Sequence, residues 1–162
     1  MTTGLFLGRF QPFHKGHLEI IRRALQDCSR VVIALGSAQD ANSTDNPFSA
    51  KERTEMIKES LKAAGLKGVK VVPVPDINCN DNYVKHVIQH TGPVDIVYAA
   101  ENKLTGDLFE RAGYRIVACR RLYGISGTRI RALMASDGKW HDMVPLSVAS
   151  IIKIRRKCPT PA

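Results

Sequence analysis

The sequence contains neither of the two common phosphate-binding signatures. No GxGxxG segment and no GxxxxGK[ST] segment occurs in its 162 residues. In both motifs, backbone N–H groups of a glycine-rich turn approach phosphate oxygens closely. Their absence excludes the usual dinucleotide fingerprint and the P-loop, so any phosphate on a ligand has to be held by other residues.

Cysteines are few and far apart. Cys28, Cys79, Cys119 and Cys158 form no CxxC pair, and the N-terminus has no basic segment followed by an apolar one, as a secretory signal would. This spacing excludes a zinc ribbon and gives no sign of a disulfide framework. We therefore expect reduced thiols and a cytoplasmic protein.

Long hydrophobic runs and aromatic residues are also lacking. No apolar run reaches the roughly 20 residues that span a bilayer, so we expect no membrane segment. Aromatic residues make up only 6% of the chain, while Lys and Arg outnumber Asp and Glu by 24 to 15. The net charge of +9 favours an anionic partner, but the basic residues form separate clusters without interleaved aromatics. Small phosphorylated ligands fit this distribution better than nucleic acid.

Five short apolar runs recur along the chain and predict strands. They alternate with segments whose apolar residues have helical spacing, such as Leu18, Ile21 and Leu25. Strands with continuous rather than alternating hydrophobic residues are typical of a parallel sheet covered on both faces by helices. We predict one α/β domain over residues 1–162, a Rossmann-like doubly wound sheet of about five parallel strands with a helical C-terminal portion at about 126–157. The expected strands are Gly4–Gly8, Val31–Gly36, Val69–Val74, Val94–Ala100 and Tyr114–Cys119.

Local signals place one further helix and one long loop. Ser49 and Glu52 have the spacing of a capping box, so a helix is predicted to begin at Ser49, and Gly65 is placed to end it. The polar stretch Ser37–Pro47 separates that helix from the second strand. Loops of this length are often binding loops or lids, and a merely solvated loop is the alternative.

The strongest chemical signal is the segment His14-Lys15-Gly16-His17. It follows the first apolar run and opens an amphipathic one, so both histidines are predicted at a strand-to-helix junction. Backbone N–H groups at a helix start are unpaired and carry the positive end of the helix dipole, and a glycine lets a ligand approach the main chain. Two imidazoles there can donate hydrogen bonds to phosphate oxygens. An arbitrary pair of loop histidines would need no such role, and a second motif decides between these interpretations.

A second predicted helix start carries hydroxyls and arginines. After the fifth strand, Ser126-Gly127-Thr128 forms a tight turn, and Arg131 lies about one turn into the following helix. The hydroxyls, the backbone N–H groups and the guanidinium can all bind phosphate. Taken alone, an ordinary N-cap with surface arginines explains this segment equally well. In a doubly wound sheet, however, ligands gather at the carboxyl ends of the strands, where both motifs fall.

Two metal-site patterns in the sequence are incomplete. Asp76–Asp81 begins like a calcium loop, but Asp81 stands where a glycine is required and Val87 where the bidentate glutamate belongs. His86 and His90 have the spacing of a helical zinc pair, yet Val87 also replaces the glutamate of a zinc protease, and no third ligand is near in the sequence. We expect no metal site built from protein ligands, and a structural or exposed role for the two histidines.

The two phosphate motifs together carry a family resemblance. Gly8–Leu18 with Ile125–Arg131 resembles the HxGH nucleotidyltransferase superfamily, whose members transfer adenylyl or cytidylyl groups on a Rossmann-like domain. Within it, the chain is most similar to the archaeal-type nicotinamide-nucleotide adenylyltransferases, and the likeness covers nearly the whole chain. The closer match also includes Gly36–Gln39, Asn46–Arg53 and Pro75–Asn80.

The resemblance implies ATP and nicotinamide mononucleotide as substrates, and NAD and pyrophosphate as products. It implies catalytic roles for His14, His17 and Arg131. The implied contacts to ATP and its phosphates are Gly8, Arg9, Phe10, Gly16, Ser126, Gly127 and Thr128, and those to the nicotinamide nucleotide are Ser37, Asp76, Asn80 and Tyr83. Mg²⁺ is expected mainly on the ATP phosphates because the sequence shows no cluster of carboxylates. Relatives commonly form homo-oligomers, so one is expected here.

Two positions depart from the family pattern. Tyr83 stands where relatives commonly carry tryptophan, which reduces the area for stacking. Asp45 stands two residues before Pro47, where relatives often carry a basic residue, so one phosphate contact from the long loop is in question. Transfer to another phosphorylated acceptor on the same scaffold is one alternative function. A non-catalytic nucleotide- or nucleic-acid-binding role is the other.

Overall fold

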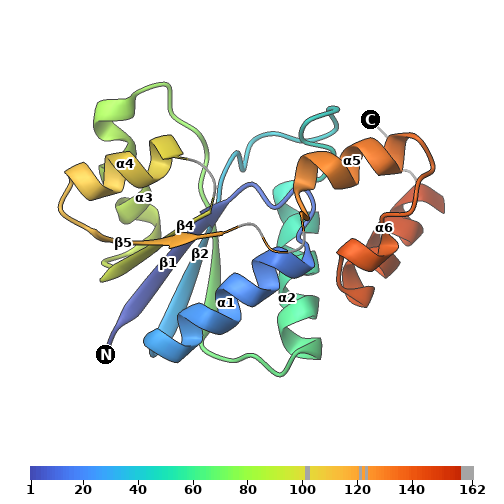
Figure 1. Cartoon of the computed structure of the whole chain (residues 1–162). Helices are drawn as coiled ribbons and strands as arrows, with labels where there is room; N and C mark the ends of the chain where they lie inside the picture. The colour runs from blue at the N-terminus through green and yellow to red at the C-terminus, as the bar shows by residue number, and fades with distance from the viewer. Residues whose placement is uncertain (101–102, 121, 123, 158–162) are drawn as a thin grey trace.

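Strands and helices alternate along the chain (Figure 1). The computed structural model describes residues 1–100, 103–120, 122 and 124–157. Within them, the strands are β1 (Thr3–Gly8), β2 (Arg30–Leu35), β3 (Val69–Pro73), β4 (Ile96–Ala100) and β5 (Arg115–Cys119). The helices are α1 (Lys15–Asp27), α2 (Ala50–Ala63), α3 (Asn80–Thr91), α4 (Lys103–Arg111), α5 (Gly127–Ala135), the short 3-10 helix η1 (His141–Met143) and α6 (Leu146–Lys157).

The five strands form one parallel sheet in the order β3-β2-β1-β4-β5. β1 pairs with β2 along its whole length and with β4 from Gly4↔Ile96 to Phe6↔Tyr98. The chain builds the sheet outward from β1 to β3 and then returns to the other side of β1 for β4. The switch point, where ligands bind in doubly wound sheets, therefore lies between β1 and β4. This arrangement confirms the predicted Rossmann-like fold, with strand ends within two residues of those expected.

Hydrophobic layers cover both faces of the sheet. On one face, α1 and α2 contribute residues such as Ile21 and Ile57, and α6 packs behind α2 with Val148. On the other face, α3 and α4 contribute Val87 and Phe109. Each of these five side chains is at most 1% exposed. The sheet is therefore buried on both faces, as expected for a parallel sheet.

Capping residues define the helix ends near that edge. Ser49 accepts the backbone N–H of Glu52 at 3.3 Å, and the Glu52 carboxylate accepts the backbone N–H of Ser49 at 2.8 Å, which confirms the predicted capping box. Gly65 follows α2 with φ of +67°, the left-handed conformation that ends helices and that glycine adopts without strain. The C-terminal helical portion consists of α5, η1 and α6. Trp140, between α5 and η1, is 2% exposed and packs in the hydrophobic core.

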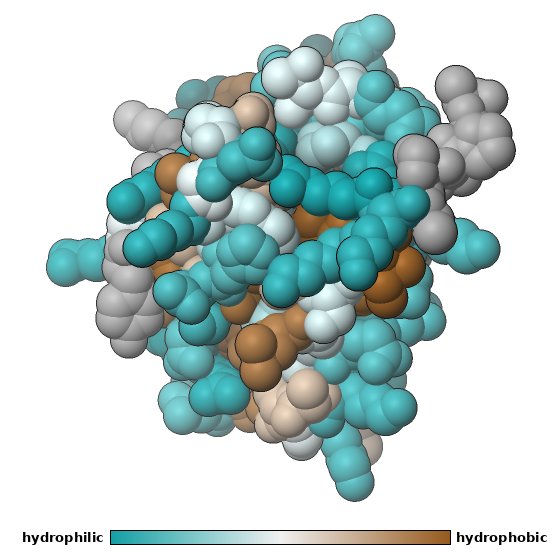
Figure 2. Space-filling model, turned by 90° about the vertical axis from the view of Figure 1, so that its right-hand side faces the viewer, coloured by the Kyte–Doolittle hydropathy of each residue, from teal (hydrophilic) through white to brown (hydrophobic). Residues whose placement is uncertain are grey.

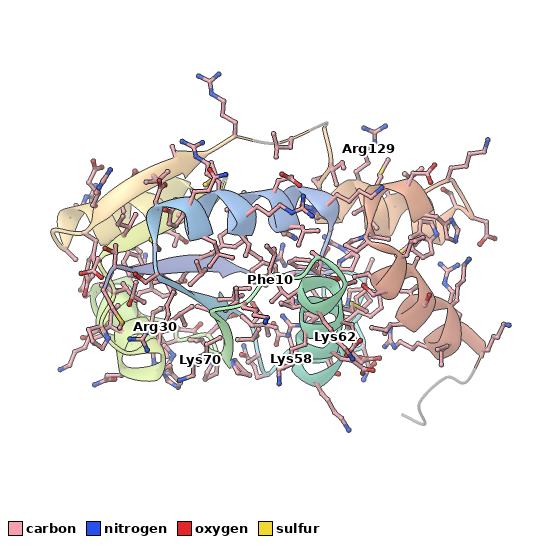
Figure 3. The ribbon with its side chains drawn as sticks, turned by 90° about the horizontal axis from the view of Figure 1, so that it is seen from below. Phe10, Arg30, Lys58, Lys62, Lys70 and Arg129 are labelled. Carbon is pink, nitrogen blue, oxygen red and sulfur yellow. The ribbon has the colours of Figure 1, made fainter. Side chains whose placement is uncertain are left out.

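Basic side chains are spread over separate parts of the surface. Figure 3 shows Arg30, Lys58, Lys62 and Lys70 on the side of β2, β3 and α2, whereas Arg129 projects from α5 on the opposite side. These five basic side chains therefore do not form one continuous stripe.

The structure also bears on the thiols and on membrane segments. None of the helices in the described ranges is long and apolar enough to cross a membrane. Cys28, Cys79 and Cys119 are free thiols. Cys158 lies outside the described residues.

Candidate active site

A cavity of about 510 Å³ opens around the switch point of the sheet. The pairing of β1 with β4 ends at Phe6↔Tyr98, and the last residues of both strands run past it. A volume of this size is typical of small-ligand sites. All fourteen residues that the resemblance implied line this cavity: Gly8, Arg9, Phe10, His14, Gly16, His17, Ser37, Asp76, Asn80, Tyr83, Ser126, Gly127, Thr128 and Arg131.

His14 and His17 cap each other at the start of α1. His14 is the N-cap residue, and its Nδ1 accepts the backbone N–H of His17 at 3.3 Å. In return, Nδ1 of His17 accepts the backbone N–H of His14 at 3.2 Å. A neutral imidazole that accepts through Nδ1 carries its proton on Nε2. The mutual cap therefore fixes both rings in the tautomer that has an Nε2–H donor.

Burial keeps His17 neutral. Its ring lies 5.9, 4.8 and 5.6 Å from the ring centroids of Phe6, Phe10 and Phe13. Phe10 itself is 2% exposed and lies in the interior (Figure 3). Desolvation in this apolar surrounding, and to a lesser degree the nearby His14, lowers the pKa of His17 well below its usual value. At physiological pH His17 is a neutral hydrogen-bond donor and not a cation.

The turn after β5 brings a second helix start to the same cavity. Ser126 caps α5 by accepting the backbone N–H of Arg129 at 3.2 Å. Gly127 approaches the segment after β1 so closely that a Cβ would lie 3.0 Å from the carbonyl oxygen of Gln11. Arg131 donates to that same carbonyl at 2.9 Å. A side chain at position 127 would force its neighbours to move by a few tenths of an ångström, so glycine favours this close approach.

Arg131 supplies a positive charge held by several neighbours. Its guanidinium lies 3.4 Å from Thr128 Oγ1 and 3.7 Å from the Asp45 carboxylate. Desolvation and the nearby Arg9 lower the pKa of Arg131, and Asp45 opposes this shift. The guanidinium stays protonated at neutral pH. Arg9 donates to Asn46 Oδ1 at 3.5 Å, so the loop before α2 contacts both arginines.

The opposite end of the cavity is formed by Ser37, Asp76, Asn80 and Tyr83. The Asp76 carboxylate accepts the backbone N–H of Ser37 at 3.1 Å and the side-chain amide of Gln39 at 3.4 Å. These bonds join the loops that follow β2 and β3. Tyr83 packs edge-on against Phe109, with ring centroids 6.4 Å apart. Burial raises the pKa of the Tyr83 phenol, which is therefore a neutral hydroxyl at physiological pH.

Arg53 is a residue of this region that sequence patterns did not reveal. Its side chain is fully buried and donates to the carbonyl oxygens of Arg9 at 2.7 Å, Gly36 at 2.8 Å and Ser37 at 2.9 Å. It also donates to the Ser49 carbonyl at 3.3 Å. One guanidinium thus joins the ends of β1 and β2 to the start of α2. Desolvation lowers its pKa, and the nearby carboxylates of Asp40, Asp76 and Glu52 oppose this shift.

Gln11 and α4 also shape the cavity, and no role was predicted for either. The Gln11 side-chain amide donates to the Phe48 carbonyl at 2.8 Å and accepts the Phe48 N–H at 3.0 Å. Leu104, Thr105 and Leu108 of α4 line the cavity wall. Pairing between a side-chain amide and a distant backbone leaves no sequence signal. α4 carries no motif that would mark its residues as part of a site.

The histidines of α3 hold local structure. His86 Nε2 lies 2.8 Å from the Pro75 carbonyl oxygen, and His90 Nδ1 lies 2.9 Å from the His86 carbonyl oxygen. This agrees with the structural role expected for both. Among the residues that the structure describes, no three His, Cys, Asp or Glu side chains are grouped to hold a metal ion.

Sequence comparisons point to one family. The family model described as cytidylyltransferase-like matches residues 5–133. The nicotinamide-nucleotide adenylyltransferase of Ignicoccus hospitalis is 44% identical over 156 residues, which cover 92% of this chain and 90% of the relative. A protein of the same name from Methanolobus tindarius is 39% identical, and the match covers 94% of this chain and 88% of the relative. Another from Pyrococcus furiosus is 38% identical, and the match covers 94% of this chain and 84% of the relative.

Solved structures share the fold. A bifunctional NMN adenylyltransferase/ADP ribose pyrophosphatase from Francisella tularensis has a TM-score of 0.80 and 24% identity, matching 96% of this chain and 50% of that longer chain. TmcAL from Thermotoga maritima, bound with alpha-thio ATP, has a TM-score of 0.66 and 14% identity, matching 97% of this chain and 56% of that one. At these identities the likeness establishes the fold alone. Because the family model spans most of the sequence and close relatives share one name, the chain belongs to the cytidylyltransferase-like family, in the group of the nicotinamide-nucleotide adenylyltransferases.

Proposed function

We propose that this chain transfers the adenylyl group of ATP to nicotinamide mononucleotide, forming NAD and releasing pyrophosphate. The observation that carries the proposal is the mutually capped histidine pair at the start of α1, which lines the same cavity as the start of α5 and Arg131. Two helix starts, two imidazole donors and a guanidinium suit a polyphosphate. The choice of acceptor is supported by the name that the sequence relatives share.

The acceptor phosphate needs no protein base. A phosphate monoester has its second pKa near about 6, so the mononucleotide is largely a dianion at neutral pH. One of its oxygens forms a bond to the α-phosphorus of ATP, the bond from that phosphorus to the bridging oxygen of the β-phosphate breaks, and pyrophosphate leaves. In both histidines Nδ1 is occupied by the cap and Nε2 carries the proton, so they act as donors.

Catalysis then consists of gathering anions and stabilising charge on the transferring group. We assign His14 and His17 to the α- and β-phosphate oxygens, and Arg131 to the β- and γ-phosphates. Backbone N–H groups, hydroxyls and a further cation around the phosphates come from Gly8, Arg9, Phe10, Gly16, Ser126, Gly127 and Thr128. Mg²⁺ enters as part of the ATP substrate, bound by its phosphate oxygens, and partly neutralises their charge.

We place the nicotinamide half of the acceptor at the other end of the cavity. The Tyr83 ring offers an aromatic surface there, and Asn80 offers both an amide donor and an acceptor. Asp76 is held by Ser37 and Gln39, and a carboxylate with two such bonds retains lone pairs for a ligand donor. These groups suit a carboxamide and ribose hydroxyls.

A panel of phosphorylated acceptors tests the proposal. Each is incubated with Mg·ATP, and pyrophosphate release is measured. We expect the fastest release with nicotinamide mononucleotide, and slower or no release with phosphopantetheine, riboflavin phosphate and a polyol phosphate; nicotinic acid mononucleotide measures tolerance for the deamidated ring. Release with another acceptor and none with nicotinamide mononucleotide would overturn the choice of acceptor. Salt-dependent oligonucleotide binding without any turnover would indicate the non-catalytic role instead.

We further expect a cytoplasmic homo-oligomer. On the side of α5 and α6, hydrophobic residues form small patches among hydrophilic ones (Figure 2). Leu146 and Ile154 of α6 are 86% and 65% exposed, respectively. Sedimentation velocity measures the number of subunits, and a monomer over the whole micromolar range would contradict this expectation.

A further inference from the structure

Arg155, in the last turn of α6, reaches the loop between β2 and α2. Its side chain is only 25% exposed, and its Nε lies 2.7 Å from Glu52 Oε1. Its Nη2 donates to Asn42 Oδ1 at 2.9 Å, and its guanidinium carbon lies 5.0 Å from the centre of the Phe48 ring. One planar cation therefore joins the middle of the loop, the end of the loop and the first turn of α2.

The contact with Phe48 leads to the catalytic region. The Phe48 backbone is paired in both directions with the Gln11 side chain, at 2.8 and 3.0 Å. The Gln11 carbonyl in turn accepts from Arg131 at 2.9 Å. A continuous series of contacts therefore runs from Arg155 on α6 to the guanidinium assigned to the β- and γ-phosphates.

The contact with Asn42 leads to the second arginine of the cavity. Asn42 begins a turn in which the Ser43 N–H donates to the Asn46 carbonyl at 3.2 Å and the Asn46 N–H donates to Ser43 Oγ at 3.0 Å. Asn46 accepts from Arg9 at 3.5 Å. Fixing Asn42 thus fixes the turn that meets Arg9.

The contact with Glu52 holds the helix start behind this loop. Glu52 Oε2 accepts from both the N–H and the O–H of Ser49 at 2.8 Å, while Oε1 faces Arg155. The two carboxylate oxygens are therefore divided between the capping box of α2 and the cation of α6. Charge-assisted bonds of this kind are stronger than neutral ones, and partial burial reduces their screening by salt.

We propose that Arg155 is a positioning residue for the ATP site: it holds the β2–α2 loop so that Arg131 and Arg9 keep the geometry that the phosphates require. This inference rests on the proposed function. In the described part of the chain, Arg155 is not among the residues that line the cavity, so it acts through the loop and not on the reactants. A shift of about 1 Å in a binding group, caused by a mutation far from the chemistry, can cost up to about 10²-fold in rate. Loss of the Arg155 contacts can therefore affect the reaction.

Arg156 provides a matched control on the same helix. It donates to the Met134 carbonyl at 2.8 Å, lies 3.9 Å from the Asp137 carboxylate and lies over the Trp140 ring at 5.9 Å. These contacts fasten α6 to the end of α5 and to the turn after it, not to the β2–α2 loop. Removing Arg156 takes one cation from the same helix turn and leaves the contacts of Arg155 with Glu52 and Asn42 in place, so the pair of variants separates a general role in stability from a role in positioning.

The test compares Arg155→Met, Arg155→Lys and Arg156→Met in the full-length protein. Calorimetry measures the Kd for Mg·ATP, steady-state kinetics separates kcat from KM, and amide hydrogen exchange follows residues 42–48. For Arg155→Met we expect faster exchange in the loop and a Kd raised about tenfold, the scale of one weakened charge-assisted bond, with a smaller change in kcat. Arg155→Lys should recover part of the affinity because it keeps the charge beside Glu52. Arg156→Met should keep the wild-type Kd and loop exchange.

Several outcomes would overturn the positioning role. Wild-type Kd and loop exchange in Arg155→Met would do so, and so would an equal rise in Kd in Arg156→Met. If Arg155→Met does not fold, Asn42→Ala removes only one partner and is expected to raise the Kd severalfold; an unchanged Kd in that variant would contradict the inference. Failure of the proposed function would look different, since wild-type protein would bind Mg·ATP but release no pyrophosphate with nicotinamide mononucleotide. Wild-type protein that binds no Mg·ATP would overturn both.

Discussion

His14 and His17 stack with ring centroids 3.5 Å apart and an angle of 16° between the rings, while each accepts the other's backbone N–H through Nδ1. Which nitrogen makes the cap decides what the ring can do. With Nδ1 occupied, the remaining Nε2–H is a donor, suited to phosphate oxygens and not to proton abstraction or metal binding. A donor pair fixed by its own helix start needs little reorganisation during the reaction.

Replacing His17 by alanine should mainly lower kcat. The variant loses one donor to the transferring phosphoryl group, and loss of such a donor typically costs about 10²-fold or more. Steady-state kinetics at saturating ATP and nicotinamide mononucleotide measures kcat for the variant and the wild type. His90→Ala, an exposed histidine of α3, serves as the control and should keep wild-type kcat. Near-wild-type turnover of His17→Ala would show that the donor is not needed.

The stability of the protein should fall with acid because of His17. An unfolded histidine takes up a proton near pH 6.5, whereas burial and His14 keep the folded pKa of His17 well below that value. Between these two pKa values the unfolded state binds more protons, so the free energy of unfolding decreases as pH falls through this window. Urea unfolding from about pH 7 to about pH 5 should show a steeper loss in the wild type than in His17→Asn. Equal slopes would mean that His17 is not held neutral.

Tyr83→Ala should weaken binding of the nicotinamide nucleotide and leave the binding of ATP unchanged. Stacking on an aromatic side chain is worth about 1–3 kcal/mol per base, so the KM for the mononucleotide should rise at least about fivefold. Tyr83→Trp offers a larger ring and should lower that KM or leave it unchanged. Initial rates with each substrate varied in turn separate the two constants. A rise confined to the KM for ATP would show that the mononucleotide does not bind next to Tyr83.

Arg53→Met should destabilise the fold. The variant removes the guanidinium donor from four carbonyl oxygens that lie just after β1, just after β2 and just before α2. The oxygens of Ser37 and Ser49 keep a backbone N–H donor, whereas those of Arg9 and Gly36 lose the guanidinium, and each buried unsatisfied group costs about 1–3 kcal/mol, of which relaxation recovers part. We expect the free energy of unfolding to drop by roughly 2–4 kcal/mol in urea titrations. Arg22→Met removes an exposed pair with Glu19 at 3.4 Å and should change stability by less than about 0.5 kcal/mol. A similar decrease in the free energy of unfolding in both variants would show that the Arg53 hydrogen bonds do not stabilise the fold more than an exposed ion pair does.

Local signals explain which parts of the fold could be predicted. The Ser49–Glu52 box, Gly65 and the apolar runs of β1 and β2 act over a few residues and are visible in the sequence. The two phosphate motifs were predictable for the same reason, since each is a short segment at a helix start. Topology then brought them together, because all parallel strands end at one edge.

Residues that act over long distances could not be predicted in this way. Arg53 binds backbone carbonyls of segments 4 to 44 residues away, and Arg155 binds Asn42, which is 113 residues away. An arginine on a predicted helix is usually exposed, and nothing in the sequence marks the one that turns inward. The Gln11 side chain pairs with the backbone N–H and carbonyl groups of Phe48. Every residue except proline has both groups, so the sequence does not indicate which residue is the partner.

The most direct test of the central claim follows the α-phosphorus of ATP. ATP that is radioactively labelled at the α-phosphate is incubated with Mg²⁺, nicotinamide mononucleotide and the protein, and the products are separated. Attack at the α-phosphorus predicts that the label appears in NAD and that the released pyrophosphate carries none. Label that stays in ATP, or that leaves in AMP or inorganic phosphate while no labelled NAD forms, would contradict adenylyl transfer.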